Sequence, residues 1–281
     1  MALVSCQALS GEFQAALPAA AGVDLVYNFT LVHGDVQSAR PDAHDRPSIW
    51  WVWGPAQAIN AGDGLHALGR TTMMRLARNG VSPERVLHAV ESLDRACLAL
   101  CEGQYMDLEF QERMVVTSAA YFDMISRKTG ALAGCAAEAG ALAAGTDEGV
   151  WAQFRDMGSK LGMAWQVRQD IVDLWGGSGD GMTASNVLNK KKSLPLIHAL
   201  ETSSLAAKRE LGGIYMKRVL EQDDASKLVE ILNEAGSKDF SEDKAQQLID
   251  QAIDALNGAG LTDQGLENLR NLGQPVLDGA A

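Results

Sequence analysis

The hydrophobic pattern of the chain is clearest in residues 158–177, GSKLGMAWQVRQDIVDLWGG. At 100° per residue, four polar side chains share one narrow stripe of the predicted helix, and apolar residues cover most of the remaining circumference. The stripe consists of Gln166, Gln169, Asp170 and Asp173. Such a helix belongs inside a bundle, where the carboxylates face a partner, an ion or a wet cavity. The alternative is a surface helix whose stripe meets water, and two tryptophans outside the stripe favour the buried position.

Two further helices are predicted in the N-terminal third of the chain. Residues 25–35 have helical periodicity, and His33 and Asp35 lie in the last turn. Residues 36–48 are predicted to form a polar loop closed by two prolines. The tryptophan-rich segment that follows is expected to become helical after Pro55.

The rest of the pattern is also helical. Ser82 is the expected N-cap and Pro83 the first-turn residue of a helix that runs to about Glu102. From residue 200 onward we predict an amphipathic helical tail interrupted by glycines. These glycines are Gly212, Gly236 and Gly258. Because no window alternates with period two for long, the chain is predicted to be all-α.

Length and composition favour a single helical bundle. The chain has 281 residues, of which 47% are hydrophobic. It contains no Pro/Gly/Ser-rich linker, low-complexity tract or internal repeat that would divide it. Residues 1–281 are therefore predicted to form one domain.

The net charge of −12 argues against nucleic acid and anionic membranes as general partners, because both bind basic surfaces. An anionic ligand must instead meet a local group of basic residues. No lysine or arginine precedes Arg40, so a signal peptide is not expected. We also expect no apolar run long enough to span a bilayer. The predicted location is the cytoplasm.

The four cysteines fit no metal-binding or redox spacing; they are Cys6, Cys97, Cys101 and Cys135. Cys97 and Cys101 are one helical turn apart. We expect both to be small buried apolar residues rather than a redox pair.

Several motifs in a fixed order resemble one family, the trans-isoprenyl diphosphate synthases, which include geranylgeranyl diphosphate synthase. The motifs are HGDVQSARPDAHDRPSIW, WGPAQAINAGD, CEGQYMDLEF, SRKTGAL, WQVRQDIVD and NKKKSLP. The resemblance runs from about residue 1 to residue 200. It implies a helical bundle in which two aspartate-rich DDxxD motifs hold Mg²⁺ against an allylic diphosphate. A departing diphosphate is highly charged, so this chemistry needs metal and a dry apolar pocket.

The resemblance places this chain's metal ligands at altered positions. The first aspartate-rich motif corresponds to residues 34–38, where Asp35 is the only aspartate. The second corresponds to Gln169, Asp170 and Asp173, with an amide in place of the first carboxylate. Neutral glutamine binds Mg²⁺ more weakly than a carboxylate. The implied metal ligands are Asp170, Asp173 and, weakly, Asp35, so any Mg²⁺ is expected to bind weakly.

The family's diphosphate-binding cations are also changed. Ala43 and His44 correspond to an arginine pair that would contact diphosphate oxygens. Asn186 takes the place of an aspartate, and Met182 that of a lysine. The family's basic motif for isopentenyl diphosphate would end at about Met1, so we expect this second substrate to lack its binding cations.

Part of an allylic diphosphate site is retained. The implied diphosphate-binding residues are Lys128, Thr129, Gln166 and Lys191, with Gln104 nearby in the pattern. Each also has a structural interpretation. The lysines are equally explained as solvated surface charges, Gln104 with Asp107 as a local helix pair, and the aspartates as partners of neighbouring cations.

The resemblance also implies a prenyl pocket just upstream of the first aspartate-rich motif. Phe29 and Thr30 occupy the positions that set the length of the bound tail, with Val26 one turn deeper. An aromatic residue beside smaller ones resembles geranylgeranyl-length pockets. The expected lipid is a prenyl diphosphate of about fifteen to twenty carbons, by resemblance only.

Three functions follow. The first is a non-elongating accessory or regulatory partner of an active prenyl diphosphate synthase, as a homodimer or as a heterodimer with that synthase. The second is a terpene cyclase or unusual prenyltransferase acting on an allylic diphosphate. The third is an active geranylgeranyl diphosphate synthase-like enzyme. Loss of several charged groups together favours the first.

Overall fold

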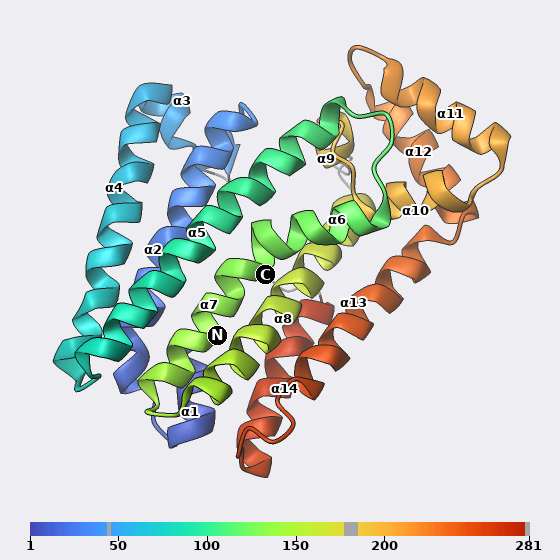
Figure 1. The fold of residues 1–281 in the computed structure, drawn as a ribbon. Coiled ribbons are helices and arrows are strands. Elements are labelled where there is room, and N and C mark those ends of the chain that lie inside the picture. The colour runs from blue at the N-terminus through green and yellow to red at the C-terminus, as the bar shows by residue number, and fades with distance from the viewer. Residues whose placement is uncertain (44–45, 177–184, 279–281) are drawn as a thin grey trace. The chain divides into compact units, whose positions relative to one another are not determined.

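The computed structural model describes residues 1–43, 46–176 and 185–278, and these are almost entirely helical (Figure 1). The all-α prediction is confirmed. The helices of the first half are α1 (Ala2–Ser10), the 3₁₀ helix η1 (Gln14–Ala16), α2 (Leu17–Gln37), α3 (Ile49–Trp53), α4 (Pro55–Met73), the 3₁₀ helix η2 (Met74–Asn79), α5 (Pro83–Glu112), α6 (Ser118–Ile125), the π-helix η3 (Ser126–Gly130) and α7 (Ala131–Ala143). Those of the second half are α8 (Glu148–Trp175), α9 (Ser185–Leu188), α10 (Leu194–Thr202), α11 (Leu205–Met216), α12 (Gln222–Glu234), α13 (Ser237–Asp254) and α14 (Asp263–Asp278).

The chain groups into two compact units, each assembled from segments distant in sequence. Unit 1 comprises Met1–Cys97, Leu132–Gly158 and Leu256–Leu269. Unit 2 comprises Leu98–Ala131, Ser159–Ala255 and Arg270–Ala281. The expectation that residues 1–281 form one domain stays a prediction.

In unit 1, α2 and α4 lie side by side, as Figure 1 shows in two shades of blue. Glycines let the two backbones approach closely. A Cβ on Gly22 would lie 2.9 Å from the carbonyl oxygen of Gly69, and a Cβ on Gly69 would lie 2.8 Å from the oxygen of Gly22. A larger residue at either position would force the helices apart.

In unit 2, the predicted buried helix is confirmed as the second part of α8. No residue between 159 and 175 is exposed. The end of α8 packs into an apolar cluster that also contains α9, α10, α11 and α12. Its fully buried members include Leu174, Leu211, Leu228 and Leu232. Because apolar residues cover most of this helix, its buried polar stripe needs hydrogen-bonding partners inside the protein.

Three local predictions differ from the structure. The loop of residues 36–48 contains a short antiparallel pair, β1 (Asp42–Ala43) and β2 (Arg46–Pro47). The tryptophan-rich segment is already helical before Pro55, as α3, and α5 continues past Glu102 to Glu112.

Two of the three predicted glycine breaks are confirmed. Gly236 and Gly258 adopt φ of 64° and 82° between helices, a region that favours glycine. Gly212 lies inside α11, so the predicted break there is wrong. A glycine weakens a helix but does not end it when the flanking residues pack. Cys101 is exposed, against prediction, whereas Cys97 is buried.

Within the described part of the chain, one helical stretch is long and apolar enough to cross a membrane. Gln14–Gln37 has a mean hydropathy of 1.4, and 22% of its apolar window is buried. The expectation that no apolar run reaches this length is therefore wrong. Core helices of soluble proteins and signal sequences have the same length and composition. The absence of a membrane span stays a prediction.

Candidate functional site

The candidate site in unit 2 begins with a buried carboxylate between two lysines. Asp107 on α5 is 6% exposed. The Lys128 ammonium donates to Asp107 Oδ2 at 2.6 Å, and the Lys191 ammonium lies 3.7 Å from the same oxygen. The structure thus brings together two of the predicted diphosphate-binding residues. Two ammonium groups meet at one carboxylate, and ammonium groups form charge-assisted hydrogen bonds with anions.

The π-helix η3 carries Lys128 and Thr129 and is packed tightly against α5. A Cβ on Gly103 would lie 2.3 Å from the backbone nitrogen of Lys128 and 2.7 Å from its Cα. Only glycine allows this approach, because backbone atoms cannot move aside as a flexible side chain can. π-Helical turns are often found at functional sites. Gly103 therefore does not end α5, and it determines how close Lys128 comes to Asp107.

Asp170, the central predicted metal ligand, is surrounded by hydrogen-bond donors within unit 2. Its Oδ2 accepts from the Tyr121 hydroxyl at 2.7 Å and from the Leu194 backbone N–H at 3.0 Å. Its Oδ1 accepts from the Gln166 amide at 3.3 Å. With 6% exposure, both oxygens are occupied inside the protein. Three of the roughly four acceptor positions of this carboxylate are taken by internal donors, which leaves little capacity for Mg²⁺.

Gln166 connects this carboxylate to the π-helix. Its amide oxygen accepts from the Thr129 hydroxyl at 2.9 Å, while its amide nitrogen donates to Asp170. Asp173 lies one turn further along α8 and is half-buried. Across the described residues, no group of three or more His, Cys, Asp or Glu side chains is arranged to hold a metal ion. The predicted Mg²⁺ ligands therefore stay a prediction.

The two buried carboxylates have opposite pKa shifts. Burial alone would raise the pKa of Asp107, but the charges of Lys128 and Lys191 outweigh it, so that this pKa is lowered. Burial raises the pKa of Asp170 to about 6, although the donors from Leu194, Tyr121 and Gln166 oppose the shift. The two lysines therefore stabilise the charged form of Asp107, whereas burial destabilises the charged form of Asp170.

Asp170→Asn is expected to maintain or increase stability at pH 8. The pKa of Asp170 is about 6 in the folded chain and 3.8 in the reference state. The folded chain therefore binds this proton more tightly than the unfolded chain does. The stabilisation that comes from protonated Asp170 is complete below pH 4 and is lost as the pH rises through 6. The buried charge costs up to about 3 kcal/mol above pH 7. Urea unfolding of both proteins from pH 4.5 to 8 tests this: the advantage of the asparagine variant should shrink toward low pH, and a constant difference would contradict it.

The other predicted site residues lie in unit 1. Val26 is fully buried on α2, and a Cβ on Gly69 would lie 2.8 Å from its Cγ2. The Phe29 ring packs edge-on against the imidazoles of His33 and His66, with centroid distances of 5.0 and 5.4 Å. These contacts are with α2 and α4.

The two remaining predicted residues of unit 1 are polar side chains on α2. Thr30 donates to the carbonyl oxygen of Tyr27 at 2.7 Å. Asp35 is half-buried in the last turn of α2. The prenyl pocket assigned to Val26, Phe29 and Thr30 stays a prediction. The side chains at positions 43, 44, 182 and 186 lie outside the described part of the chain.

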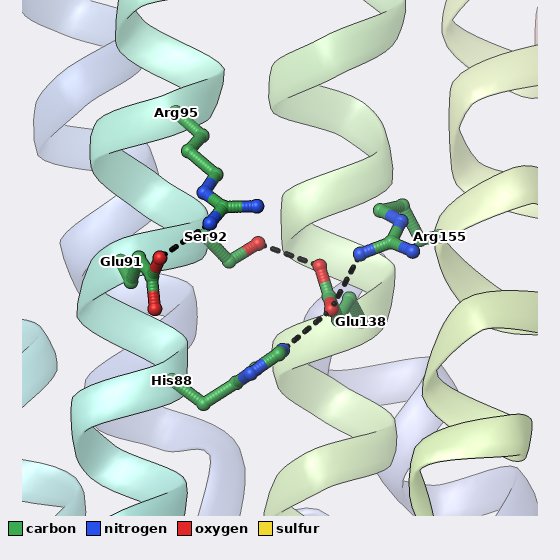
Figure 2. A network of polar contacts seen from close by, with 6 residues as sticks. All are labelled: His88, Glu91, Ser92, Arg95, Glu138 and Arg155. Atoms are coloured by element: carbon green, nitrogen blue, oxygen red, sulfur yellow. Dashed lines mark hydrogen bonds and ion pairs between the residues drawn. The ribbon is translucent and has the colours of Figure 1, made fainter.

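Unit 1 contains a second buried polar network, which the sequence pattern did not predict (Figure 2). Glu138 on α7 is 2% exposed. It accepts from His88 at 2.9 Å, from Ser92 at 2.5 Å and from Arg155 at 3.1 Å. His88 and Ser92 come from α5 and Arg155 from α8, so one carboxylate joins three helices. The signal in the sequence was a single glutamate inside the apolar run GALAGCAAEAGALAAG.

Known proteins resemble this chain over most of its length. The family model for polyprenyl synthetase matches residues 1–232. The geranylgeranyl diphosphate synthase of Mycobacterium tuberculosis is 36% identical over 90% of this chain and 71% of its own length. The geranylgeranyl pyrophosphate synthase of Geoglobus acetivorans is 32% identical over 89% of this chain and 76% of its own.

Solved structures with the same fold include the polyprenyl synthetase from Streptomyces coelicolor A3(2), with a TM-score of 0.89 and 29% identity, covering 98% of this chain and 82% of that one. The polyprenyl synthase from Caulobacter crescentus CB15, solved with calcium and isoprenyl diphosphate, has a TM-score of 0.86 and 26% identity, covering 100% of this chain and 83% of that one. The resemblance noted in the sequence is confirmed. The chain belongs to the polyprenyl synthetase family.

Proposed function

We propose that this chain is a non-elongating family member that binds a prenyl diphosphate and acts as an accessory or regulatory partner of an active prenyl diphosphate synthase. One observation supports this most directly. The retained lysines of the allylic site meet at Asp107, whereas the predicted metal ligand Asp170 directs both oxygens to internal donors. The site is thus suited to bind an anion more than to hold metal.

The two lysines supply direct contacts for diphosphate oxygens. In the free protein both ammonium groups, of Lys128 and Lys191, interact with the Asp107 carboxylate. A bound diphosphate would take over some of these interactions. Charge-assisted hydrogen bonds of this kind are about twice as strong as neutral ones. The lipid we propose has about fifteen to twenty carbons, in line with the relatives named for geranylgeranyl diphosphate.

Catalysis needs more than binding. Ionising an allylic diphosphate requires stabilisation of developing charge by metal ions and fixed cations, and losing one well-placed donor costs about a hundredfold to a thousandfold. Gly34, Ser38, Ala43, His44 and Gln169 stand where the family resemblance places charged groups. Their effects are not additive, but the combined loss should be large. An accessory role is compatible with that loss.

The decisive experiment is an activity assay on the purified chain. We expect no condensation with isopentenyl diphosphate, because a second diphosphate lacks fixed cations at Ala43 and His44. The protein is incubated with Mg²⁺ and dimethylallyl, geranyl, farnesyl or geranylgeranyl diphosphate, with and without isopentenyl diphosphate. Diphosphate release and prenyl products are measured, with an active geranylgeranyl diphosphate synthase as the positive control.

Each outcome has a distinct meaning. A longer prenyl diphosphate above the no-enzyme control would overturn the proposal in favour of an active synthase. Diphosphate release and hydrocarbon products without isopentenyl diphosphate would favour the terpene cyclase alternative. Binding without either product is the expected result.

An exposed apolar stripe on α5 supports assembly with a second subunit. Leu98, Cys101, Tyr105 and Leu108 follow one another at helical spacing on the part of α5 within unit 2. Leu98 and Tyr105 are 67% and 68% exposed. A row of this kind is typical of a covered helix face, and homodimer interfaces are more apolar than other surfaces. We propose that this stripe contacts a second copy or an active synthase.

A dimer is therefore expected at micromolar concentration. Leu98→Glu combined with Tyr105→Glu should shift the chain to a monomer in sedimentation velocity, because charges would be buried in the interface. Val115→Glu is the matched control, since Val115 is 76% exposed beyond the end of α5. A wild-type monomer that also fails to bind the host's active synthase would remove the accessory role.

A further inference from the structure

Three consecutive lysines before α10 have three different surroundings. Lys191 approaches Asp107, with its ammonium 3.7 Å from the Oδ2 atom. The Lys190 ammonium donates to the carbonyl oxygen of Lys217 at 2.5 Å. Lys192 is only 7% exposed. Of the three lysines, only Lys191 points to the candidate diphosphate site.

The backbone of this turn is strained at Lys190. Its φ of 57° lies in the left-handed region, which L-residues with a side chain rarely occupy. Such strain persists only where surrounding contacts over-determine the conformation. The turn therefore needs partners that hold residues 190–192 in place.

Lys192 is the first of these partners. Its ammonium lies 3.4 Å from the carbonyl oxygens of both Gln111 and Lys190, and 4.6 Å from the centre of the Tyr215 ring. Burial, with the charge of Lys190, lowers the pKa of Lys192, and the charge of Glu112 opposes this. A cation over an aromatic face is stabilised further when it is desolvated. Lys192 thus connects the turn to the end of α5 and to α11.

Tyr215 on α11 is the second partner. Its hydroxyl donates to the carbonyl oxygen of Lys191 at 3.3 Å. The ring packs against the apolar cluster of Leu211 and Ile214. Burial, followed by the charge of Asp173, raises the pKa of Tyr215, so the hydroxyl keeps its proton at neutral pH.

We propose that Tyr215 is a positioning residue for diphosphate binding. Its hydroxyl fixes the Lys191 carbonyl, its ring holds Lys192, and together these contacts direct the Lys191 ammonium toward Asp107 and Lys128. The proposal rests on the proposed function, because it assigns Lys191 to the ligand. Neither the motif resemblance nor the helical pattern singled out Tyr215, which lies in a segment predicted only as an amphipathic tail.

Tyr215→Phe tests this, because it removes the hydroxyl and keeps the ring. One neutral hydrogen bond contributes about fivefold to an equilibrium, so affinity for inorganic pyrophosphate, measured by calorimetry, is expected to fall about fivefold. In a Lys191→Ala background the same change should have no further effect, since the residue it positions is absent. Tyr27→Phe is the matched control, because Tyr27 is 41% exposed on α2 in unit 1, whereas Lys191 and Lys192 belong to unit 2. Equal thermal midpoints would exclude a general loss of fold.

A ligand-free measurement separates this proposal from the proposed function. Limited acetylation followed by peptide mass spectrometry should show faster modification of Lys191 in Tyr215→Phe, with Lys227 unchanged as the internal reference. Unchanged labelling of Lys191, or an effect of Tyr215→Phe that persists without Lys191, overturns the positioning role. Faster labelling in a protein that does not bind pyrophosphate supports the positioning role and overturns the diphosphate-binding function instead.

Discussion

Lys128→Ala is expected to weaken binding of a non-hydrolysable farnesyl diphosphate analogue by about tenfold or more, the size of a charge-assisted hydrogen bond. The lysine contacts Asp107 at 2.6 Å, and its side chain is 21% exposed, so its ammonium can reach a ligand. Without it, one of the two ammonium groups next to Asp107 is lost, and with it a positive charge that attracts diphosphate.

Asp170→Asn should weaken binding far less, because the Asp170 oxygens already accept from Tyr121, Leu194 and Gln166. This ranking is the reverse of that expected for a site led by metal. Calorimetric titration of both variants with and without Mg²⁺ measures it. Lys227→Ala is the matched control, since Lys227 is also ion-paired, with Glu210, and more exposed. Strong Mg²⁺ dependence abolished by Asp170→Asn would overturn the ranking and favour the cyclase.

Glu138→Ala is expected to lower the free energy of unfolding by about 3 kcal/mol, the range observed when one member of a buried charged network is removed. The change deletes the acceptor shared by His88, Ser92 and Arg155 and leaves a cavity among three helices (Figure 2). Urea unfolding followed by circular dichroism measures the effect.

Two neighbouring variants test whether burial is the cause. Arg155→Ala should cost only about 1 kcal/mol, because the Arg155 side chain is 54% exposed and its contribution is screened by water. Glu91→Ala, which removes an ion pair with Arg95 at the surface, should have little effect. If Glu138→Ala costs no more than Glu91→Ala, the buried network does not stabilise unit 1.

Several features could be predicted from the sequence because their causes are local. The periodicity of residues 158–177 predicts a buried helix with a polar stripe, and no residue from 159 to 175 is exposed. Pro83 and the glycines at 236 and 258 mark helix ends through their own backbone preferences. The order of motifs was sufficient to assign the family, because spacing within a fold persists after individual residues change.

Local reasoning fails where a residue's role depends on a distant partner. Gly103 was expected to follow the end of a helix, yet it lies within α5 because the backbone of Lys128 needs the space. Glu138 lies in an apolar run and is satisfied by residues 50, 46 and 17 positions away in the chain.

The sequence alone determined the helical class, the buried position of the second part of α8, and the candidate residues at the polar stripe and in the lysine cluster. Only the tertiary structure decided which partners these residues have and which of them are charged. Asp107 became the partner of Lys128 and Lys191, and Asp170 the acceptor for Tyr121 and the Leu194 backbone. The physical reason is that periodicity depends on near neighbours, whereas the charge state and partners of a buried carboxylate depend on which donors the fold brings within hydrogen-bonding distance.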